Sequence, residues 1–246
     1  MVAAMAVTLP ALGYRRTTER AARHPLVWLP ALELALDALS GQVGTLTRAA
    51  TAAPSDSYGV ARTVVHSQPA WHYVAALGKT GLLLGVDASL AWPLPLLPGA
   101  YGGAVHFVEN GGAAIAGGGV LYLGNDAATG ARIWIESSGT VYRLKYTDGT
   151  TTRTVTLGAA PAAGDEVWLR WGLTAAGVAQ LWQSINGAAE STPGPAAALT
   201  LPAAWSGTTL RLNSVGSGSQ GNNVYLGAAV LASAPTLSAL QTVLTP

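Results

Sequence analysis

Two tryptophans and an arginine are the strongest candidates for contact with a ligand. Trp168 and Arg170 alternate with apolar residues in a β-like segment, so they point away from the face that the apolar residues bury. Trp182 follows in the next such segment, where hairpin pairing can place it beside them. An outward-facing group of tryptophan and arginine suits stacking on a sugar ring or a subunit interface. Burial under a neighbouring layer of the same protein is the alternative.

Two pairs of polar residues are further candidates for ligand contact. They are Asn125–Asp126 and Asn222–Asn223, each close to a predicted strand. Such pairs hold calcium ions or sugar hydroxyls in the loops of β-sandwich lectins. Ordinary turns are also rich in asparagine and aspartate and explain both pairs equally well. We therefore treat the four residues as candidate ligand contacts and predict no metal or other cofactor.

Two glycine-rich stretches match nucleotide-binding motifs only in part. Gly78–Lys79–Thr80 resembles the end of a phosphate-binding loop, but Tyr73 stands where that motif requires glycine. Residues 216–221 fit the dinucleotide-binding pattern, yet residues 223–231 read as a strand and provide no helix N-terminus for a phosphate. We predict a turn at the first stretch and an inter-strand loop at the second.

Residues suited to catalysis or metal binding do not group along the chain. There is no cysteine, and among four histidines only His66 and His72 can meet across a turn. Glycoside hydrolysis needs two carboxyl groups roughly 5–10 Å apart. Glu136, Asp165 and Glu166 are the plausible contributors, and nothing in their spacing brings them together. We therefore predict that the protein is not an enzyme, with carbohydrate hydrolysis as an alternative.

From residue 58 onward the sequence is typical of an all-β domain, because β-favouring runs alternate with glycine-rich turns. The clearest hairpin joins residues 140–147 and 150–157 through Asp148–Gly149, a dipeptide that favours tight turns. A second hairpin joins residues 166–173 and 178–185. Further predicted strands are residues 59–66, 81–86, 102–109, 120–124, 131–136, 208–213 and 223–231. Between these strands, residues 188–204 are predicted to form a long surface loop, and residues 235–244 a short helix at the end.

The segment before this domain carries a helical repeat. Its apolar residues are spaced alternately by three and four positions over three heptads, which predicts an amphipathic helix. This helix either joins copies of the chain in a coiled coil or packs on its own domain. The predicted oligomerisation residues are Leu29, Leu32, Leu36, Leu39, Val43 and Leu46, with Ala50 closing the repeat. Residues 1–57 thus form an arm, a heptad helix and a linker, and residues 58–246 form the β domain.

The amino-acid composition indicates which kinds of partner the protein can have. Half of the residues are hydrophobic and 10% are charged, whereas charged residues are normally about a quarter of a soluble chain. Such sparse charge is expected where partner subunits cover much of the surface. The net charge of +1 creates no field that would attract nucleic acid. No apolar run is long enough for membrane insertion, and no basic stretch precedes the apolar start, so we predict neither a transmembrane segment nor a secretory signal.

The sequence resembles a known superfamily between about residues 100 and 240. Residues 165–187 read DEVWLRWGLT, then a short turn, then VAQLWQSING, and residues 209–231 contain TLRLNS and NVYLGAAVL. These runs are similar to strands of the concanavalin A-like, laminin G-like jelly-roll superfamily. The resemblance implies an antiparallel jelly-roll β-sandwich of the kind found in lectins, adhesins, hydrolases and structural modules. The acidic catalytic motif of the glycosidase members is not visible.

The layout of arm, heptads, linker and jelly-roll head resembles that of tailed-bacteriophage virion proteins such as tail fibres and receptor-binding proteins. This resemblance implies a homotrimer located in the phage particle. Its partners would be other copies of the chain, other virion proteins and host cell-surface carbohydrate. We therefore predict a structural virion protein, tail-fibre or baseplate-associated, with a lectin-like head. A capsid or tail decoration module without a ligand, and a carbohydrate-active hydrolase, are the alternatives.

Overall fold

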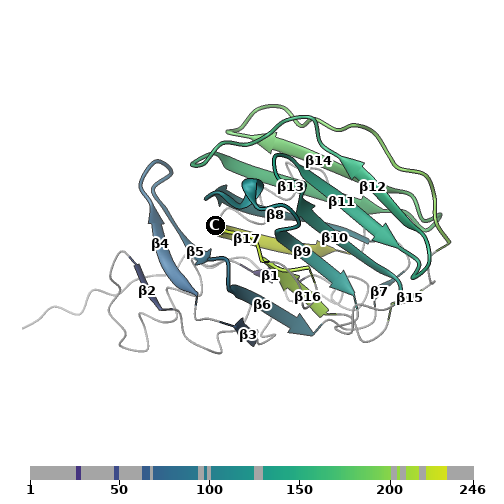
Figure 1. The fold of residues 1–246 in the computed structure, drawn as a ribbon, viewed down its shortest axis with the longest axis horizontal. Helices are drawn as coiled ribbons and strands as arrows, with labels where there is room; N and C mark the ends of the chain where they lie inside the picture. Colours follow the sequence, from purple (N-terminus) through teal and green to yellow (C-terminus); the bar gives the residue numbers. More distant parts are fainter. Residues whose placement is uncertain are drawn as a thin grey trace, which may run out of the picture.

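The computed structural model describes residues 26–28, 47–49, 63–66, 69–93, 97–98, 101–124, 130–200, 204–205, 209–215 and 220–231. Within these ranges the one helical element is η2 (Gly112–Ala114), a single 3₁₀ turn. The strands form two antiparallel sheets that share one hydrophobic core (Figure 1). The predicted all-β antiparallel sandwich is thereby confirmed.

Sheet I has the strand order β14-β13-β8-β17-β5-β4-β2 among the described residues, and β1 also pairs with β17. Its strands are β1 (Leu26–Trp28), β2 (Thr47–Ala49), β4 (Ala70–Val74), β5 (Lys79–Leu84), β8 (Tyr101–Glu109), β13 (Glu166–Leu173), β14 (Ala179–Ile185) and β17 (Asn223–Leu231).

Sheet II has the order β12-β11-β10-β9-β16-β6-β3 over the same part of the chain. Its strands are β3 (Thr63–His66), β6 (Ala88–Pro93), β9 (Gly119–Gly124), β10 (Arg132–Ser137), β11 (Tyr142–Thr147), β12 (Thr152–Thr156) and β16 (Thr209–Leu212). A separate two-stranded ribbon pairs β7 (Leu97–Pro98) with β15 (Ala204–Trp205).

Alternate side chains of both sheets fill the core. Leu169 and Trp171 of β13 enter it from sheet I, and Ile133 and Leu144 enter it from sheet II, all with 0% exposure. Because side chains along a strand alternate between faces, their sequence neighbours must lie on the outer faces of the sandwich. The outer faces are therefore where this fold can present polar and aromatic groups to a ligand.

The two predicted hairpins are present, although one turn differs from the expectation. Thr147 pairs with Thr152, so the β11–β12 loop has four residues, and Asp148 Oδ1 accepts the backbone N–H of Thr150 at 2.8 Å instead of sitting in a two-residue turn. Gly149 supplies the positive φ of this loop. The turn after β14 has positive φ at both Asn186 and Gly187, as a type I′ turn requires.

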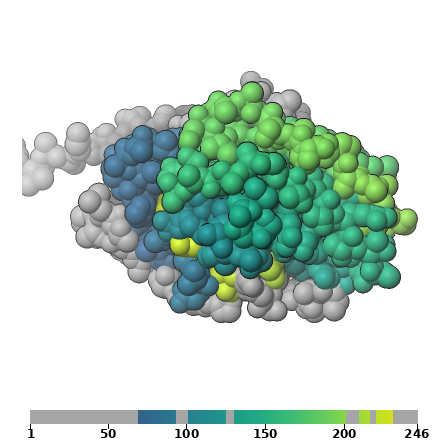
Figure 2. All heavy atoms as spheres, turned by 45° about the horizontal axis from the view of Figure 1, so that its top comes forward, coloured from purple at the N-terminus to yellow at the C-terminus, as the bar shows by residue number. Residues whose placement is uncertain are grey.

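After this turn, residues 188–200 form a strap along the edge of the sandwich, drawn in light green in Figures 1 and 2. Ser191 exchanges two backbone hydrogen bonds with Gln183 of β14, at 2.8 and 2.9 Å. Further along, Leu199 donates its N–H to the carbonyl of Gly177 at 3.0 Å and buries its side chain in the core. The described part of the predicted surface loop is therefore bound to the sheet edge.

Several strands are absent from the sequence-based prediction. The structure adds β4 and β6 as full strands. Strand β6 lies in an apolar run that has no alternation to separate one strand from the next. Residues 88–92 are buried throughout, which is why their sequence shows no polar face.

The N-terminal segment contributes strands to sheet I. Leu26–Trp28 pairs with β17, and Thr47–Ala49 pairs with β4. The predicted helix therefore does not continue through residues 47–49, and that end of the heptad interpretation is wrong. Residues 29–46, which hold the predicted oligomerisation residues, lie outside the described residues, as does the predicted helix at 235–244. The domain boundary after residue 57 stays a prediction.

A membrane-spanning helix is not found in the part of the chain that the structure describes.

The strap provides a test of the fold. Gly177 and Gly187 both have positive φ, at 74° and 75°, but a Cβ on Gly177 would lie 1.7 Å from the Leu199 carbonyl oxygen, whereas a Cβ on Gly187 would meet nothing within 4 Å. Gly187→Ala should cost about 1–2 kcal/mol of unfolding free energy, the penalty of a left-handed alanine. Gly177→Ala should cost about 1–3 kcal/mol more, because the strap must move. Urea unfolding of both variants measures the difference, and equal costs would show that the close approach has no energetic consequence.

Candidate functional site

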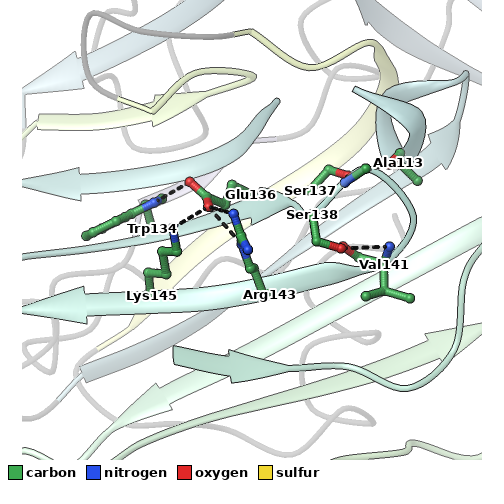
Figure 3. Close-up of polar contacts among 9 residues, drawn as sticks. Ala113, Trp134, Glu136, Ser137, Ser138, Val141, Arg143 and Lys145 are labelled. Atoms are coloured by element: carbon green, nitrogen blue, oxygen red, sulfur yellow. Dashed lines mark hydrogen bonds and ion pairs between the residues drawn. The ribbon is translucent and has the colours of Figure 1, made fainter. Parts of the chain in front are cut away.

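A cluster of charged and aromatic side chains lies on the outer face of sheet II. Ile133 and Ile135 of β10 point into the core, so Trp134 and Glu136 between and after them point outward. The pairing of β10 with β11 sets Trp134 opposite Lys145. Glu136 lies opposite the next basic residue of β11, Arg143, in the same register. Figure 3 shows the four side chains together on one side of the sheet.

The carboxylate of Glu136 is the centre of this cluster. Its Oε1 accepts Arg143 Nε at 2.8 Å and lies 2.7 Å from Lys145 Nζ. Its Oε2 accepts the indole N–H of Trp134 at 2.7 Å. Burial raises the pKa of Glu136, but hydrogen bonds from Lys145, Trp134 and Arg143 outweigh burial and hold the pKa below its ordinary value. Glu136 is therefore an anion near neutral pH, with both oxygens occupied.

The Trp134 ring is fixed in orientation and half-buried. Arg132 Cζ lies 5.4 Å from the ring centroid, and Lys145 Nζ lies 5.9 Å from it, both within the range of cation–π attraction. The side chains of Arg143 and Lys145 are 29% and 25% exposed, respectively. The cluster thus presents one oriented indole and several positive charges near the solvent.

Neighbouring strands extend this face. Tyr122 of β9 lies opposite Trp134, and its side chain is buried. On the other side, Thr154 and Thr156 of β12 lie opposite Lys145 and Arg143, and both threonines are exposed. We call the set Arg132, Trp134, Glu136, Arg143 and Lys145 the Trp134 cluster. Chemically it can stack on an apolar sugar face and donate hydrogen bonds to oxygen atoms beside that ring.

The sequence-based search missed the Trp134 cluster, although the signal was available. Arg132 and Trp134 alternate with two isoleucines, and Arg143 and Lys145 alternate with Tyr142, Leu144 and Tyr146. Pairing these two runs as neighbouring strands would have placed an aromatic ring among three cations. The search instead considered Glu136 only as a candidate catalytic acid.

The residues predicted as a ligand patch lie on the opposite outer face of the sandwich, on sheet I. The structure brings Trp168, Arg170 and Trp182 together as expected, because Arg170 pairs with Trp182 in the β13–β14 register. Trp168 and Arg170 are, however, only 4% and 8% exposed. Trp168 stacks on the ring of His106 with a centroid distance of 3.8 Å. These contacts pack the rings against protein and offer a ligand little surface.

Arg170 is also satisfied within the chain. Its Nε and Nη2 donate to the two carboxylate oxygens of Glu190, each at 2.8 Å, and its guanidinium lies 3.6 Å from the Trp182 ring centroid. Glu190 belongs to the strap, so this ion pair ties the strap to the outer face of sheet I.

Next to this patch, His106 donates from Nε2 to Glu166 Oε1 at 2.7 Å, and Lys79 Nζ lies 3.5 Å from the same oxygen. Burial lowers the pKa of His106, so its ring is neutral near pH 7. The hydrogen bond from His106 in turn holds the pKa of Glu166 below its ordinary value. The group therefore acts as an internal hydrogen-bonded network.

The asparagine pair at residues 222–223 makes hydrogen bonds within the chain. Asn222 and Asn110 bond through their amide groups, with Asn110 Nδ2 donating to Asn222 Oδ1 at 3.1 Å. Asn223 is fully buried, and its Nδ2 lies 3.5 Å from the hydroxyl of Tyr142. That hydroxyl donates to Glu109, whose Oε1 accepts the N–H of Ala113 at 2.9 Å. Both asparagines therefore hold the end of β17 to its neighbours.

The other predicted pair, Asn125–Asp126, lies outside the described residues. It follows the end of β9 and precedes β10, the strands that carry Tyr122 and Trp134. Its part in ligand contact stays a prediction.

Glu136 and Glu166, two of the carboxylates predicted as plausible contributors to hydrolysis, lie on different sheets. Glu136 is on the outer face of sheet II, whereas Glu166 is on the outer face of sheet I, so the hydrophobic core lies between them. Asp165 accepts hydrogen bonds from Asn186 and from the Ala162 backbone. Among the described residues, no group of three or more histidine, aspartate and glutamate side chains could hold a metal ion.

Comparison with known proteins identifies the fold through structure and not through sequence. No protein-family model matches the chain, and a search of curated proteins finds no relative. Domain 4 of AbnA, an extracellular GH43 arabinanase from Geobacillus stearothermophilus solved with arabinotriose, is similar with a TM-score of 0.53 and 13% identity over 78% of this chain and 92% of that one.

Two other solved structures have the same fold in part of their length. A GH54 α-L-arabinofuranosidase has a TM-score of 0.58 and 13% identity over 86% of this chain and 53% of its own. The binding domain of botulinum neurotoxin serotype G has a TM-score of 0.53 and 9% identity over 77% of this chain and 47% of its own. This chain therefore spans about half of each.

These likenesses and the observed sheets show that the chain has a two-sheet, antiparallel jelly-roll β-sandwich fold. At such low identity they describe the architecture alone, because one fold hosts many unrelated functions.

The Trp134 cluster makes a prediction about stability and pH. At pH 7, Glu136→Gln should lower the unfolding free energy by about 1.5–3 kcal/mol, because it removes the charge that accepts three hydrogen bonds. Since the pKa of Glu136 is lowered by folding, this stabilisation is fully present above the ordinary value of 4.5 and is lost as the pH falls through the folded pKa. Urea unfolding at pH 7 and pH 3 should show the gap between the two proteins narrowing in acid. If the two proteins had equal unfolding free energies at pH 7, or a difference that did not change with pH, the stabilising role of the Glu136 charge would be contradicted.

Proposed function

We propose that this protein binds glycans on the outer face of sheet II, with Trp134 as the stacking surface. One observation carries the proposal: the Trp134 ring is half-buried and is held in place by Glu136 at 2.7 Å on an outer sheet face. An aromatic ring with a fixed orientation loses little conformational freedom when a sugar stacks on it. Arg143 and Lys145 beside it donate hydrogen bonds to ligand oxygens.

The architecture supports this proposal. The arabinanase domain with a similar fold was solved with arabinotriose, and another similar structure concerns botulinum neurotoxin type C and its interaction with two ganglioside molecules, at a TM-score of 0.52 and 10% identity. The fold therefore occurs in proteins that contact carbohydrate. The proposal for this chain still depends on the Trp134 cluster, since fold alone does not define a ligand.

We propose a binding role without catalysis. In support, Glu136 and Glu166 lie on opposite outer faces, and Glu136 already accepts from three donors. A carboxylate with a lowered pKa is also a poor general acid at neutral pH. Hydrolysis of an arabinan or another glycan by the wild-type protein would overturn this part of the proposal.

An assembly role is the second candidate, and the sparse charge of the chain, 10%, favours it. In this proposal the protein is a homotrimeric structural protein of a phage particle, tail-fibre or baseplate-associated, with other virion proteins as partners. The heptad residues Leu29–Leu46 would join the copies, and the sandwich would remain the lectin-like head. It rests on the resemblance in layout and is compatible with glycan binding.

Substitution of two tryptophans tests which face binds. Trp134→Ala should reduce glycan binding at least about tenfold, because loss of one stacking ring costs about 1–3 kcal/mol by analogy with base stacking. Trp182→Ala removes a half-buried tryptophan from the opposite face and should retain binding. Circular dichroism checks that both variants are folded, and a glycan array followed by calorimetry on the best ligand measures affinity. Loss of binding in Trp182→Ala alone would move the site to sheet I.

Light scattering on the full chain tests the assembly role. A homotrimer has three times the 24.9 kDa mass of the chain, and Leu36→Asp should reduce that mass because a charge in a heptad seam is unpaired. A monomer at micromolar concentration would contradict the assembly role and leave the glycan proposal intact.

A further inference from the structure

We propose that the ligand of the Trp134 cluster is an acidic glycan, whose carboxylate or sulfate group binds Arg132, Arg143 and Lys145. This inference rests on the proposed function and adds the chemical class of the ligand. It is carried by the charge balance of the cluster and by its hydrogen-bonding capacity.

The cluster has an excess of positive charge. Arg132, Arg143 and Lys145 are cations, and Glu136 is the one acidic residue in the described strands of sheet II. Three cations with one carboxylate leave two positive charges on a face of a protein whose total net charge is only +1. Arg143 and Lys145 share a single oxygen of Glu136, at 2.6 and 2.7 Å. One anion cannot neutralise both, so a second anion is favoured there.

The cluster also has more hydrogen-bond donors than its one carboxylate can accept. Arginine and lysine side chains only donate hydrogen bonds, and both oxygens of Glu136 already accept from Trp134, Arg143 and Lys145. A neutral sugar hydroxyl binds best where it can donate as well as accept, whereas carboxylate and sulfate oxygens only accept. The hydroxyls of Thr154 and Thr156, opposite Lys145 and Arg143, can donate to the same oxygens.

The geometry places the charge beside the stacking surface. Arg132 and Lys145 both lie within 6 Å of the Trp134 ring centroid, so a sugar stacked on the indole would hold a charged substituent within reach of them. Arg132 has one described hydrogen bond, to the Gly130 carbonyl at 3.3 Å, and no described carboxylate partner. It is therefore the cation most available to a ligand.

A polyanion such as nucleic acid fits these observations less well. The overall charge balance is nearly neutral, and the Trp134 cluster contains one stacking ring, whereas single-stranded nucleic acid binding uses an extended positive groove with several aromatic rings. The cations of the Trp134 cluster lie on two neighbouring strands, β10 and β11, and Arg211 of β16 lies two strands away on the same outer face, opposite Tyr122.

Matched glycan pairs test the inference on the full chain. An array should contain sialylated, sulfated and uronate glycans, each beside a counterpart that is desialylated, desulfated or methyl-esterified. We expect an acidic member to bind roughly tenfold more tightly than its neutral counterpart, and this preference to shrink several-fold when salt screens the exposed cations. Arg132→Gln should lower affinity for the acidic member about three- to tenfold and leave the neutral member unchanged. Arg153→Gln, an exposed arginine of β12 outside the cluster, controls for net charge.

The outcomes separate the inference from the proposed function. Equal binding of acidic and neutral members, lost in Trp134→Ala, would keep the glycan proposal and overturn the acidic-ligand inference. A folded wild-type protein that binds no member of the array would overturn both. Tighter binding of an oligodeoxythymidine than of any acidic glycan would overturn both in favour of a nucleic-acid site.

Discussion

Burial of alternate side chains between the two sheets is the constraint on which the rest of this molecule depends. Leu169 and Trp171 from one sheet and Ile133 and Leu144 from the other are fully buried in one core. Once these residues face inward, the period of two along each strand forces Trp134 and Lys145 outward. Strand pairing then sets them opposite each other, within the range of electrostatic contact. The position of the proposed site is thus a consequence of core packing.

A second constraint lies inside the sandwich, at the end of β8. The carboxyl group of Glu109 is buried and accepts hydrogen bonds from Tyr142 and from the backbone N–H of Ala113. Burial raises its pKa despite these donors. Nearby, Asn213 has positive φ and donates to the carbonyls of Gly85 and Ala88 at 2.8 and 2.7 Å. Such networks fix the register of strands far apart in sequence, because each unpaired polar group would cost free energy.

The sequence predicted those parts of the fold in which alternation and turn chemistry agree. Strands β13 and β17 begin and end at the predicted residues. Strand β6 could not be found, because residues buried on both faces show no alternation. The sequence placed Trp168 and Arg170 on an outer face and left open whether they contact a ligand or are buried, because their burial depends on contacts with His106 and Glu190. These partners are 62 and 20 residues away in sequence and become neighbours only after folding.

The Trp134 cluster could not be recognised from neighbouring residues in the sequence, because it forms only when strands β10 and β11 pair. Each of its residues is unremarkable alone: Glu136 looks like an isolated acid, and Arg143 like a solvated charge. Only the β10–β11 register shows that three donors converge on one carboxylate. Register is set by packing and by the length of the connecting loop, so short motifs carry little information about it.

The strap has a consequence for how this protein behaves in a crowded solution. Strand β14 is the last strand of sheet I, and its outward backbone groups would otherwise attract a strand of another molecule. Ser191 occupies the groups of Gln183, and the carbonyls of Ala179 and Gly177 accept from Ala196 and Leu199. The strap therefore occupies backbone groups at this edge of sheet I that could pair with another molecule. In a protein with so few charged residues, this protects the edge from fibre-like association of many copies.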